Sequence, residues 1–367
     1  MQDAQSLYKS EKTKRIRLIQ ILSVSLVAAF LGSLSLGSIY IAPIDVLKSI
    51  GHGLFPAWVD SPSQVTYTII SVVRIPRCLL AILAGFALGV SGAVMQSTLR
   101  NPLVSPFTLG LSSAASFGAA LIIVSGPMIF GAFFNKSINF GIGPFYVSSV
   151  LVVISAFAFG ILSMLIVLAI GRINDQSRSI VILGGVIIGY LFQAGVTALK
   201  YISEDGALRE ITIWLMGGMW GASWKSVLPL IPIVLVCCAV LYRKAVLFNA
   251  LSGGDDVAKT LGVDVPKFRR DTLLVATLCT SACIAFTGII GFIGLMSPHI
   301  CRMMIGNDQR YLLPASTLMG ALILLISDTA ARMILAPVEL PVGVLMYLIG
   351  GAFFIYLITS GRGRGME

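Results

Sequence analysis

The feature that most constrains this chain is a series of apolar runs, separated by short polar turns. Most of the runs are about 20 residues long, which matches the hydrocarbon thickness of a bilayer for a helix. Apolar residues make up 57% of the chain and charged residues only 11%, and a water-soluble protein of this composition could not cover its surface. The sequence therefore predicts an all-α, polytopic membrane protein. A transmembrane β-barrel is excluded because its strands would alternate over about ten residues.

Ten spans are expected, the eighth of which is short and contains Pro298, His299 and Arg302. Keeping this weak span leaves more of the 26 Lys and Arg residues on the inner side than deleting it does, as the positive-inside rule favours. Both chain termini are then predicted to be cytoplasmic. The expected spans are about 18–42, 75–97, 105–125, 145–170, 180–200, 226–243, 272–294, 295–305, 312–333 and 341–359.

The organisation between the spans follows from charge and length. Residues 1–17 form a basic segment that we expect in the cytoplasm, residues 18–360 a single transmembrane domain, and residues 361–367 a cytoplasmic tail. The longest inner loop is 244–271. The segments expected outside or at the outer interface are 43–73, 126–144 and 203–212.

The stretch 74–110 carries the densest pattern in the chain. Arg74 and Arg77 flank a proline, which suits the first turn of a helix because its missing N–H would be unbonded there in any case. The two arginines are therefore expected where this helix leaves the membrane on the outer side. Gly85 and Gly89 stand four residues apart, a spacing that predicts close packing of a second helix.

The long inner loop predicts two short helices on the membrane surface. A Gly-Gly turn at 253–254 precedes Asp255 and Asp256, and acidic residues favour the first turn of a helix. We expect Gly262 to end this helix and Pro266 to begin the second one.

Composition also excludes several classes of function. The net charge of +10 is dispersed over short loops, which argues against nucleic-acid binding. The six cysteines lie within or at the ends of apolar runs and form no C-x-x-C, so we expect small buried hydrophobic residues. The two histidines, His52 and His299, are far apart in the chain, so no metal site and no bound cofactor is expected.

The chain carries no G-x-x-x-x-G-K-[ST] sequence and so should not bind ATP by a P-loop. Energy for moving a solute would then come from a partner protein or from an ion gradient. An ion-coupled carrier usually needs a midplane carboxylate or a broken-helix ion site, and the acidic residues here lie near the ends of the spans. No nucleophile stands in a pattern with a base, which disfavours a membrane-embedded enzyme.

Several segments together resemble the permease subunits of bacterial ABC importers for iron-siderophores, haem and cobalamin. Each segment is weak by itself, but their order and spacing are specific and extend over nearly the whole chain. They are Arg74–Arg77, Gly92–Gln96, Asn101–Leu103, Trp214–Gly218, Leu261–Val263, Gly288–Gly294, Ser297–Ile300, Ser327–Arg332 and Glu339–Gly343.

The resemblance implies the type II importer permease fold, with ten spans per subunit and a translocation path between two permease subunits. These two subunits are either copies of one chain or related chains. The resemblance also implies two separate ATP-binding subunits on the inner side, which use ATP and Mg²⁺, and a soluble substrate-binding protein on the outer side. The expected location is the plasma (inner) membrane of a bacterium.

Three arginines carry over from the pattern of the family. Arg74 and Arg77 match its external Arg-x-Pro-Arg, and Arg332 matches the arginine after the ninth span. In the family such arginines meet carboxylates of the binding protein, and a guanidinium group suits this role because it is always charged and bonds a carboxylate with two N–H groups. From the residues alone, snorkelling toward lipid phosphates stays an alternative.

The resemblance also assigns roles on the inner side. The loop 250–270 matches the coupling helices that fit into a groove of the ATPase, with contacts expected from Asp256, Val257, Ala258, Leu261, Gly262 and Val263. The path is expected to include Gln96, and a gate region corresponds to Ser177, Arg178 and Ser179.

The resemblance favours a ferric siderophore as the imported solute. Haem, cobalamin and molybdate stay open, because the binding protein rather than the permease selects the solute. An ion-coupled secondary transporter is the less favoured alternative.

Overall fold

The computed structural model describes residues 2–60, 62–139, 144–172 and 177–360, and most of them are helical. The predicted tail 361–367 lies outside the described residues. The elements are α1 (Gln2–Ser35), α2 (Pro43–Leu54), α3 (Gln64–Thr68), the π-helix η1 (Ile69–Arg74), α4 (Ile75–Leu99), α5 (Leu111–Phe130), the 3₁₀-helix η2 (Gly131–Phe133), β1 (Ser137–Asn139), β2 (Pro144–Tyr146), α6 (Val147–Arg172), α7 (Arg178–Ile202), α8 (Asp205–Met216), α9 (Trp224–Arg243), α10 (Ala245–Ser252), α11 (Asp255–Thr260), α12 (Val265–Thr287), α13 (Ile293–Ile305), α14 (Gln309–Ile334) and α15 (Val342–Thr359).

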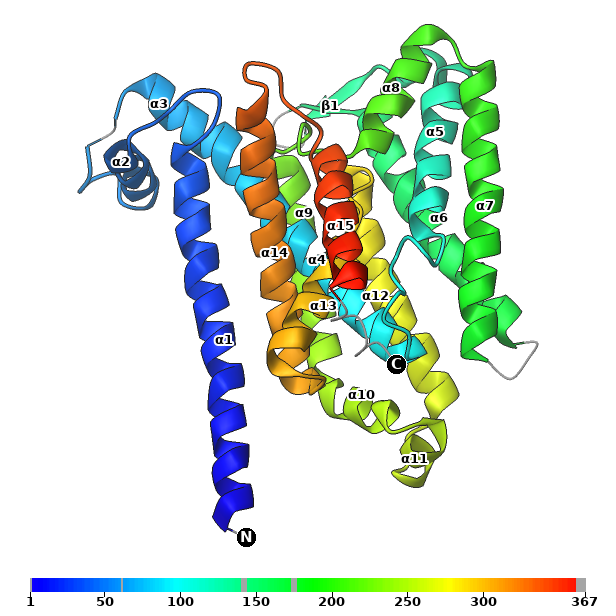
Figure 1. The fold of residues 1–367 in the computed structure, drawn as a ribbon. Helices are drawn as coiled ribbons and strands as arrows, with labels where there is room; N and C mark the ends of the chain where they lie inside the picture. Colours follow the sequence, from blue (N-terminus) through cyan, green and yellow to red (C-terminus); the bar gives the residue numbers. More distant parts are fainter. Residues whose placement is uncertain (1, 61, 140–143, 173–176, 361–367) are drawn as a thin grey trace.

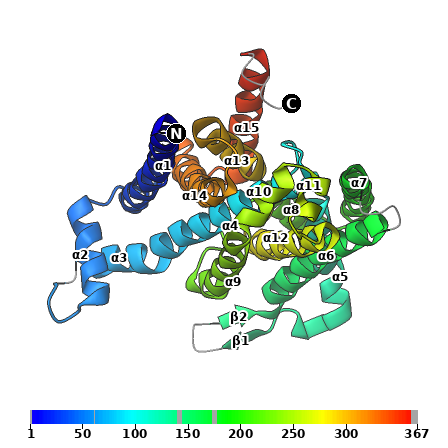
Figure 2. The ribbon, with the colours of Figure 1, turned by 90° about the horizontal axis from the view of Figure 1, so that it is seen from below.

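Helix α4 is the centre of the bundle. Inside its segment, 83% of the most apolar window of residues is buried, compared with 33% for α1, α5, α6 and α7. Helices α9, α12, α13 and α14 pack directly against it. Viewed along the bundle, α13 and α14 lie on one side of α4, and α9 and α12 lie on the other (Figure 2).

Glycines on one face of α4 let its neighbours approach to backbone contact. A Cβ atom at Gly85 would stand 2.3 Å from the Cα of Ala321 in α14, and one at Gly92 would stand 1.9 Å from the carbonyl oxygen of Gly294 in α13. Gly89 meets α14 in the same way. The predicted Gly85-x-x-x-Gly89 packing is confirmed, and Gly92 extends it to a second helix.

Helices α5, α6 and α7 form a second group beside the centre (Figure 1). Phe117, Phe159 and Phe192, one from each helix, pack with ring centroids 5.3 to 6.0 Å apart. Gly185 of α7 lies against the backbone of Leu109, where a Cβ would come within 2.7 Å. Aromatic packing and a close backbone approach therefore hold this group together.

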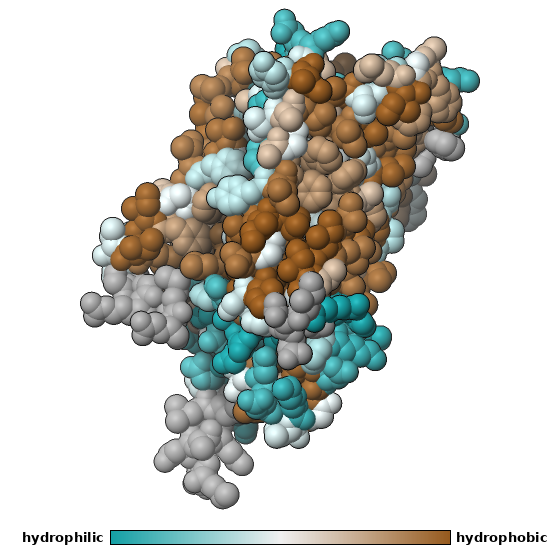
Figure 3. Space-filling view, turned by 90° about the vertical axis from the view of Figure 1, so that its right-hand side faces the viewer, coloured by the Kyte–Doolittle hydropathy of each residue, from teal (hydrophilic) through white to brown (hydrophobic). Residues whose placement is uncertain are grey.

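Nine helical segments in the described part of the chain are long and apolar enough to cross a membrane. Figure 3 shows their side chains as a broad apolar band with polar residues gathered at both ends. Helix α13 has 13 residues, which at about 1.5 Å each is too short to cross the hydrocarbon alone. It is nevertheless buried between α4 and α14, so the weak eighth span of the sequence corresponds to a short helix inside the bundle.

Two predicted boundaries were wrong. The first helix is continuous from Gln2 to Ser35, so residues 2–17 of the basic segment and the first span form one helix, which ends earlier than expected. The second span does not begin at about 75, because α3, η1 and α4 form one helical segment over Gln64–Leu99. The proline at 76 removes a backbone donor, and the preceding turn takes the wider π-helical spacing, so the helix continues rather than starting there.

The inner loop contains the expected short helix over Asp255–Thr260, preceded by Gly254 at a φ of +120° and followed by Gly262 at +83°. Left-handed values of this kind favour glycine. Helix α10 precedes it. Pro266 does not begin a short helix as predicted, because it stands in the first turn of the long helix α12.

One carboxylate, Asp308, fastens the inner loops. It stands just before α14, accepts hydrogen bonds from Asn249 and Arg310 and pairs with Arg15 of α1 at 3.1 Å. The hydrogen bonds from Arg310 lower the pKa of this carboxyl group from 3.8 to about 2. The carboxylate thereby joins α1, α10 and α14.

We expect Gly92→Ala to prevent stable packing of α13 against α4, because the added methyl group has no room beside Gly294. Overpacking of this kind costs roughly 1–3 kcal/mol or more. The matched control is Gly32→Ala in α1, where a Cβ meets nothing within 4 Å. Thermal unfolding in detergent measures both, and equal unfolding temperatures would contradict the packing.

The lowered pKa of Asp308 predicts how the stability of the protein depends on pH. The group contributes stability above its ordinary pKa of 3.8, and this is lost as the pH falls toward about 2. Asp308→Asn should therefore lower stability at neutral pH by roughly 1–2 kcal/mol and have little effect near pH 2. Thermal unfolding across this range, with the exposed Asp256→Asn as the control, measures the difference. A loss that does not depend on pH would contradict it.

Candidate functional site

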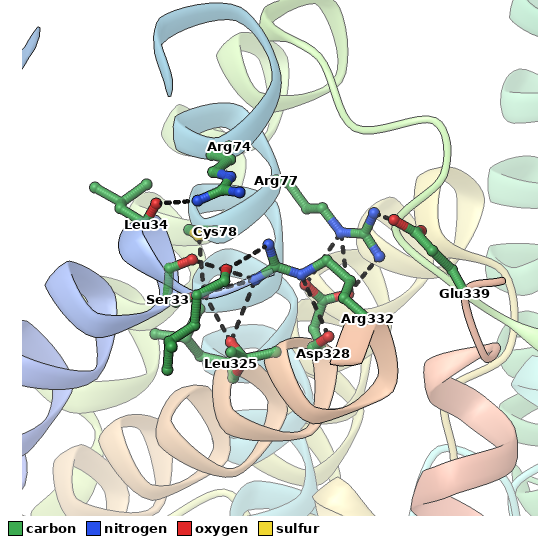
Figure 4. A network of polar contacts seen from close by, with 11 residues as sticks. Ser33, Leu34, Arg74, Arg77, Cys78, Leu325, Asp328, Arg332 and Glu339 are labelled. Atoms are coloured by element: carbon green, nitrogen blue, oxygen red, sulfur yellow. Dashed lines mark hydrogen bonds and ion pairs between the residues drawn. The ribbon is translucent and has the colours of Figure 1, made fainter. Parts of the chain in front are cut away.

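The three arginines singled out in the sequence meet at the end of the bundle that carries the β-hairpin (Figures 1 and 4). Arg74 ends η1, Arg77 stands in the first turn of α4, and Arg332 lies in the last turn of α14. All three side chains are buried. Between them lies Asp328 of α14, which is fully buried.

Arg77 is held by two carboxylates. Its Nε lies 3.2 and 3.1 Å from the two oxygens of Asp328, and its Nη2 donates to the same group at 3.0 Å. Its Nη1 donates to Glu339 at 2.7 Å. This forked pairing is the geometry in which an arginine binds most strongly. The two carboxylates differ in exposure, because the side chain of Asp328 is 0% exposed and that of Glu339 is 31% exposed.

Arg74 bonds to backbone rather than to a carboxylate. Its Nη1 donates to the carbonyl oxygens of Leu34 at 2.5 Å and Ser35 at 3.0 Å, and its Nη2 donates to that of Ile39. These carbonyls belong to the last turn of α1 and the segment after it. Carbonyl groups at a helix C-terminus lack partners within the helix and carry partial negative charge. Arg74 therefore caps α1.

Arg332 completes the cluster. Its Nε lies 3.3 Å from an oxygen of Asp328, four residues earlier on the same helix, and its Nη2 donates to the hydroxyl of Ser33 at 2.8 Å. Asp328 is thus shared between two guanidinium groups. Together the contacts tie α1, α4, α14 and the segment before α15 at one level of the bundle.

This geometry changes the interpretation of the three arginines. The sequence places them at the outer surface, available to the carboxylates of a partner, whereas the structure buries them and gives them partners within the chain. Buried charges persist when they are paired and hydrogen-bonded. Docking of a binding protein at these positions stays a prediction.

Three of the motif segments meet beside this cluster. Gly217 follows α8 at a φ of +65°, and a Cβ atom on it would lie 1.9 Å from the carbonyl oxygen of Ile289, in the link between α12 and α13. Gly218 donates to the carbonyl of Thr287 at 2.8 Å, and Gly343 at the start of α15 donates to that of Gly217 at 3.2 Å. The motifs are therefore spatial neighbours that fix the start of α15.

Gln96, expected on the path, is buried and joins two helices. Its side-chain nitrogen donates to the carbonyl oxygen of Gly294, and its oxygen accepts from Arg302 of α13 at 3.0 Å. Ser91 of α4 is buried too and donates to the carbonyl oxygen of Ala276 in α12 at 2.9 Å. Within the isolated subunit both side chains hold α4 to its neighbours, and the place of Gln96 on a path stays a prediction.

The six residues predicted to contact an ATPase divide into two sets. Asp256, Val257, Leu261 and Gly262 are exposed at the end of the bundle opposite the arginine cluster, with the side chain of Asp256 99% exposed. Ala258 is 0% exposed, and Val263 is also buried. The buried pair packs the loop onto the bundle, so only the exposed set can contact a partner in this conformation.

The predicted gate residues, Ser177, Arg178 and Ser179, line a cavity of about 300 Å³. The rest of its lining is Leu99, Arg100, Asn101 and Ile182. Asp255, the first residue of α11, lies 3.8 Å from Arg178 and 3.0 Å from Arg269 of α12. The exposed loop and the start of α7 are therefore linked by a shared carboxylate.

A larger cavity of about 580 Å³ lies among β2, α6, α8 and α9. Trp214 and Trp220 line it together with Glu210 and Lys225. Partial burial raises the pKa of the Glu210 carboxyl group above its ordinary value. Tryptophans at this end match the aromatic enrichment of a membrane interface.

No group of three or more His, Cys, Asp or Glu side chains that could hold a metal ion occurs among the described residues. All six cysteines are free and buried. The pairing of Asp328 and Glu339 with Arg77 was not predicted from the sequence. The i, i+4 spacing of Asp328 and Arg332 is the one signal that was available.

Comparison with known proteins identifies the family. The FecCD transport family matches residues 25–360. The hemin transport system permease protein of Yersinia pestis is 38% identical over 83% of this chain and 87% of its own. The Fe(3+)-citrate import system permease protein of Bacillus subtilis is 35% identical over 95% of this chain and 97% of its own.

A solved structure shares the fold. It is an inward-facing conformation of a metal-chelate type ABC transporter, with 30% sequence identity, a TM-score of 0.78, and coverage of 94% of this chain and 99% of the other. The all-α type II importer permease fold expected from the sequence is thereby confirmed. Because the family match and both relatives extend over most of the sequence, this chain belongs to the FecCD transport family.

Proposed function

We propose that this chain, with residues 18–360 as one domain, is the permease subunit of an ABC importer that carries a ferric siderophore. The observation that supports this most strongly is the family match over residues 25–360. Relatives are named for hemin, Fe(3+)-citrate, iron(3+)-hydroxamate and cobalamin. Ferric chelates recur among these names, which favours an iron chelate here. Haem, cobalamin and molybdate are the alternative solutes in the same architecture.

Energy comes from two separate ATP-binding subunits that use ATP and Mg²⁺. The chain has no P-loop sequence, and α11 presents exposed side chains at one end of the bundle. These side chains form the contact with the ATPase, and the shared carboxylate Asp255 links that contact to the gate residues around Arg178.

A second permease subunit completes the path. Helix α15 is the least enclosed of the spanning helices, with 28% of its most apolar window buried, and it projects from the bundle in Figure 2. Its exposed residues include Leu348, Ile355 and Ile358. A second copy or a related chain covers this face, which suits the proposed path between two subunits.

The membrane is the plasma membrane, with the α11 end in the cytoplasm and the arginine cluster outside. The start of α1 and helix α11 lie at the same end of the bundle (Figure 1), which supports a cytoplasmic N-terminus. A soluble substrate-binding protein docks on the outer end, where Arg74, Arg77 and Arg332 are gathered.

Uptake by the assembled importer in vesicles tests the energy source. We expect iron-chelate uptake to stop when ATP is depleted and to continue when a protonophore removes the ion gradient. The reverse result would favour the ion-coupled secondary transporter. Supplying haem, cobalamin and molybdate in the same assay separates the four solutes, because only the carried one competes.

The exposed set on the inner loop predicts a cross-linking pattern. A cysteine at Val257 or Leu261 should cross-link to the ATPase subunit, because both side chains are exposed. Ala258→Cys, one residue away and buried, is the matched control and should not react. The native cysteines are buried, so their background is low. Cross-linking from the buried position alone would contradict the assigned face.

A further inference from the structure

The two carboxylates on Arg77 are not equivalent. Asp328 is fully buried inside the cluster and also pairs with Arg332. Glu339 approaches from the outer side with its side chain 31% exposed and contacts only the Nη1 group, at 2.7 Å. A carboxylate arriving from solution could replace Glu339 without disturbing Asp328. The guanidinium itself is covered, because the side chain of Arg77 is 10% exposed.

Glu339 belongs to the segment 335–341, which joins α14 to α15. Residues 335–338 of this segment are exposed. Directly after it, Val342 is 1% exposed, and Gly343 donates to the carbonyl oxygen of Gly217 at 3.2 Å. The Arg77–Glu339 ion pair is thus the side-chain contact that fastens the exposed segment to α4, immediately before the start of α15.

We propose that Glu339 is a releasable latch on Arg77, and that a carboxylate of an acidic soluble partner takes its place. The inference rests on the proposed function, because the partner is the binding protein that docks on this end. It adds that docking is an exchange of one carboxylate for another, and that the exchange frees the segment before α15.

Exchange explains how a buried arginine can take part in docking. Leaving a buried charge unpaired is strongly unfavourable, but Arg77 keeps two carboxylates throughout, one from Asp328 and one from either Glu339 or the partner. Released Glu339 enters water, where its charge is solvated. Backbone bonds from Ala336 to Met333 and from Leu340 to Ala331 still restrain the segment, and Gly343 directly after it still bonds to Gly217, so it loosens without detaching.

The test measures how often the start of α15 opens. A cysteine replaces the buried Val342 in the full chain in lipid nanodiscs, and its labelling by a membrane-impermeant maleimide reports the open fraction. Val338→Cys, which is 66% exposed, corrects for intrinsic reactivity. The six native cysteines are buried and contribute little.

Adding Glu339→Ala should raise the labelling rate of Val342→Cys roughly tenfold or more, the equivalent of one charge-assisted hydrogen bond. Glu339→Gln keeps an acceptor and should give a smaller rise. The matched control is Glu204→Ala, which removes an exposed carboxylate just before α8 and should change nothing. An unchanged rate in Glu339→Ala would overturn the proposal, because other contacts would then hold the segment.

A second arm tests whether an external carboxylate can replace Glu339. Tethered groups reach effective concentrations on the order of millimolar, so acetate at about 0.3 M can compete. Replacing chloride by acetate at equal ionic strength should accelerate labelling of Val342→Cys when Glu339 is present. It should have no effect when Glu339→Ala is also present. Equal rates in both salts would overturn the exchange. Neither arm needs the ATPase, so failure of ATP-driven uptake and failure of the latch are separate results.

Discussion

The structure depends on one buried carboxylate. Asp328 faces Arg77 and Arg332 inside the bundle, and Arg74 stands beside them on η1. Without a negative charge at this position, three guanidinium groups would be buried together, at a cost that hydrophobic packing does not offset. With it, the same groups join α1, α4, α14 and the segment before α15. Asp328, which permits this arrangement, is more deeply buried than the three arginines.

The second constraint is backbone proximity along α4. Helices in lipid gain little from burying apolar surface against each other, so contact between them depends on close packing. Gly85, Gly89 and Gly92 bring α14 and α13 to within backbone contact. This closeness places Arg77 near Asp328 and Gln96 near Gly294. The polar contacts at both ends of α4 thus follow from the glycines between them.

The parts of the fold that depend on local pattern could be predicted. Long apolar runs located the spanning helices, the glycine pair located a packing face, and the acidic pair after 253–254 located α11. The pairing of Arg77 with Asp328 joins residues that are 251 positions apart, and no local pattern encodes such a contact. For this reason the sequence predicted the arginines at the surface. The burial of Ala258 beside the exposed Val257 was missed for a similar reason, since α11 has 6 residues and shows too little periodicity to reveal its inner face.

The unbroken helical segment from Gln64 to Leu99 has a mechanical consequence. Its 36 residues extend about 54 Å, whereas the hydrocarbon layer is about 30 Å thick. The segment runs obliquely through the bundle in Figure 1, from α3, which lies beside α2, to the end of α4 at Leu99. A rod of this length and stiffness turns a small tilt at one face of the membrane into a sideways displacement at the other. Because α9, α12, α13 and α14 pack directly against α4, its tilt is set by these neighbours, and any change of tilt must be shared with them.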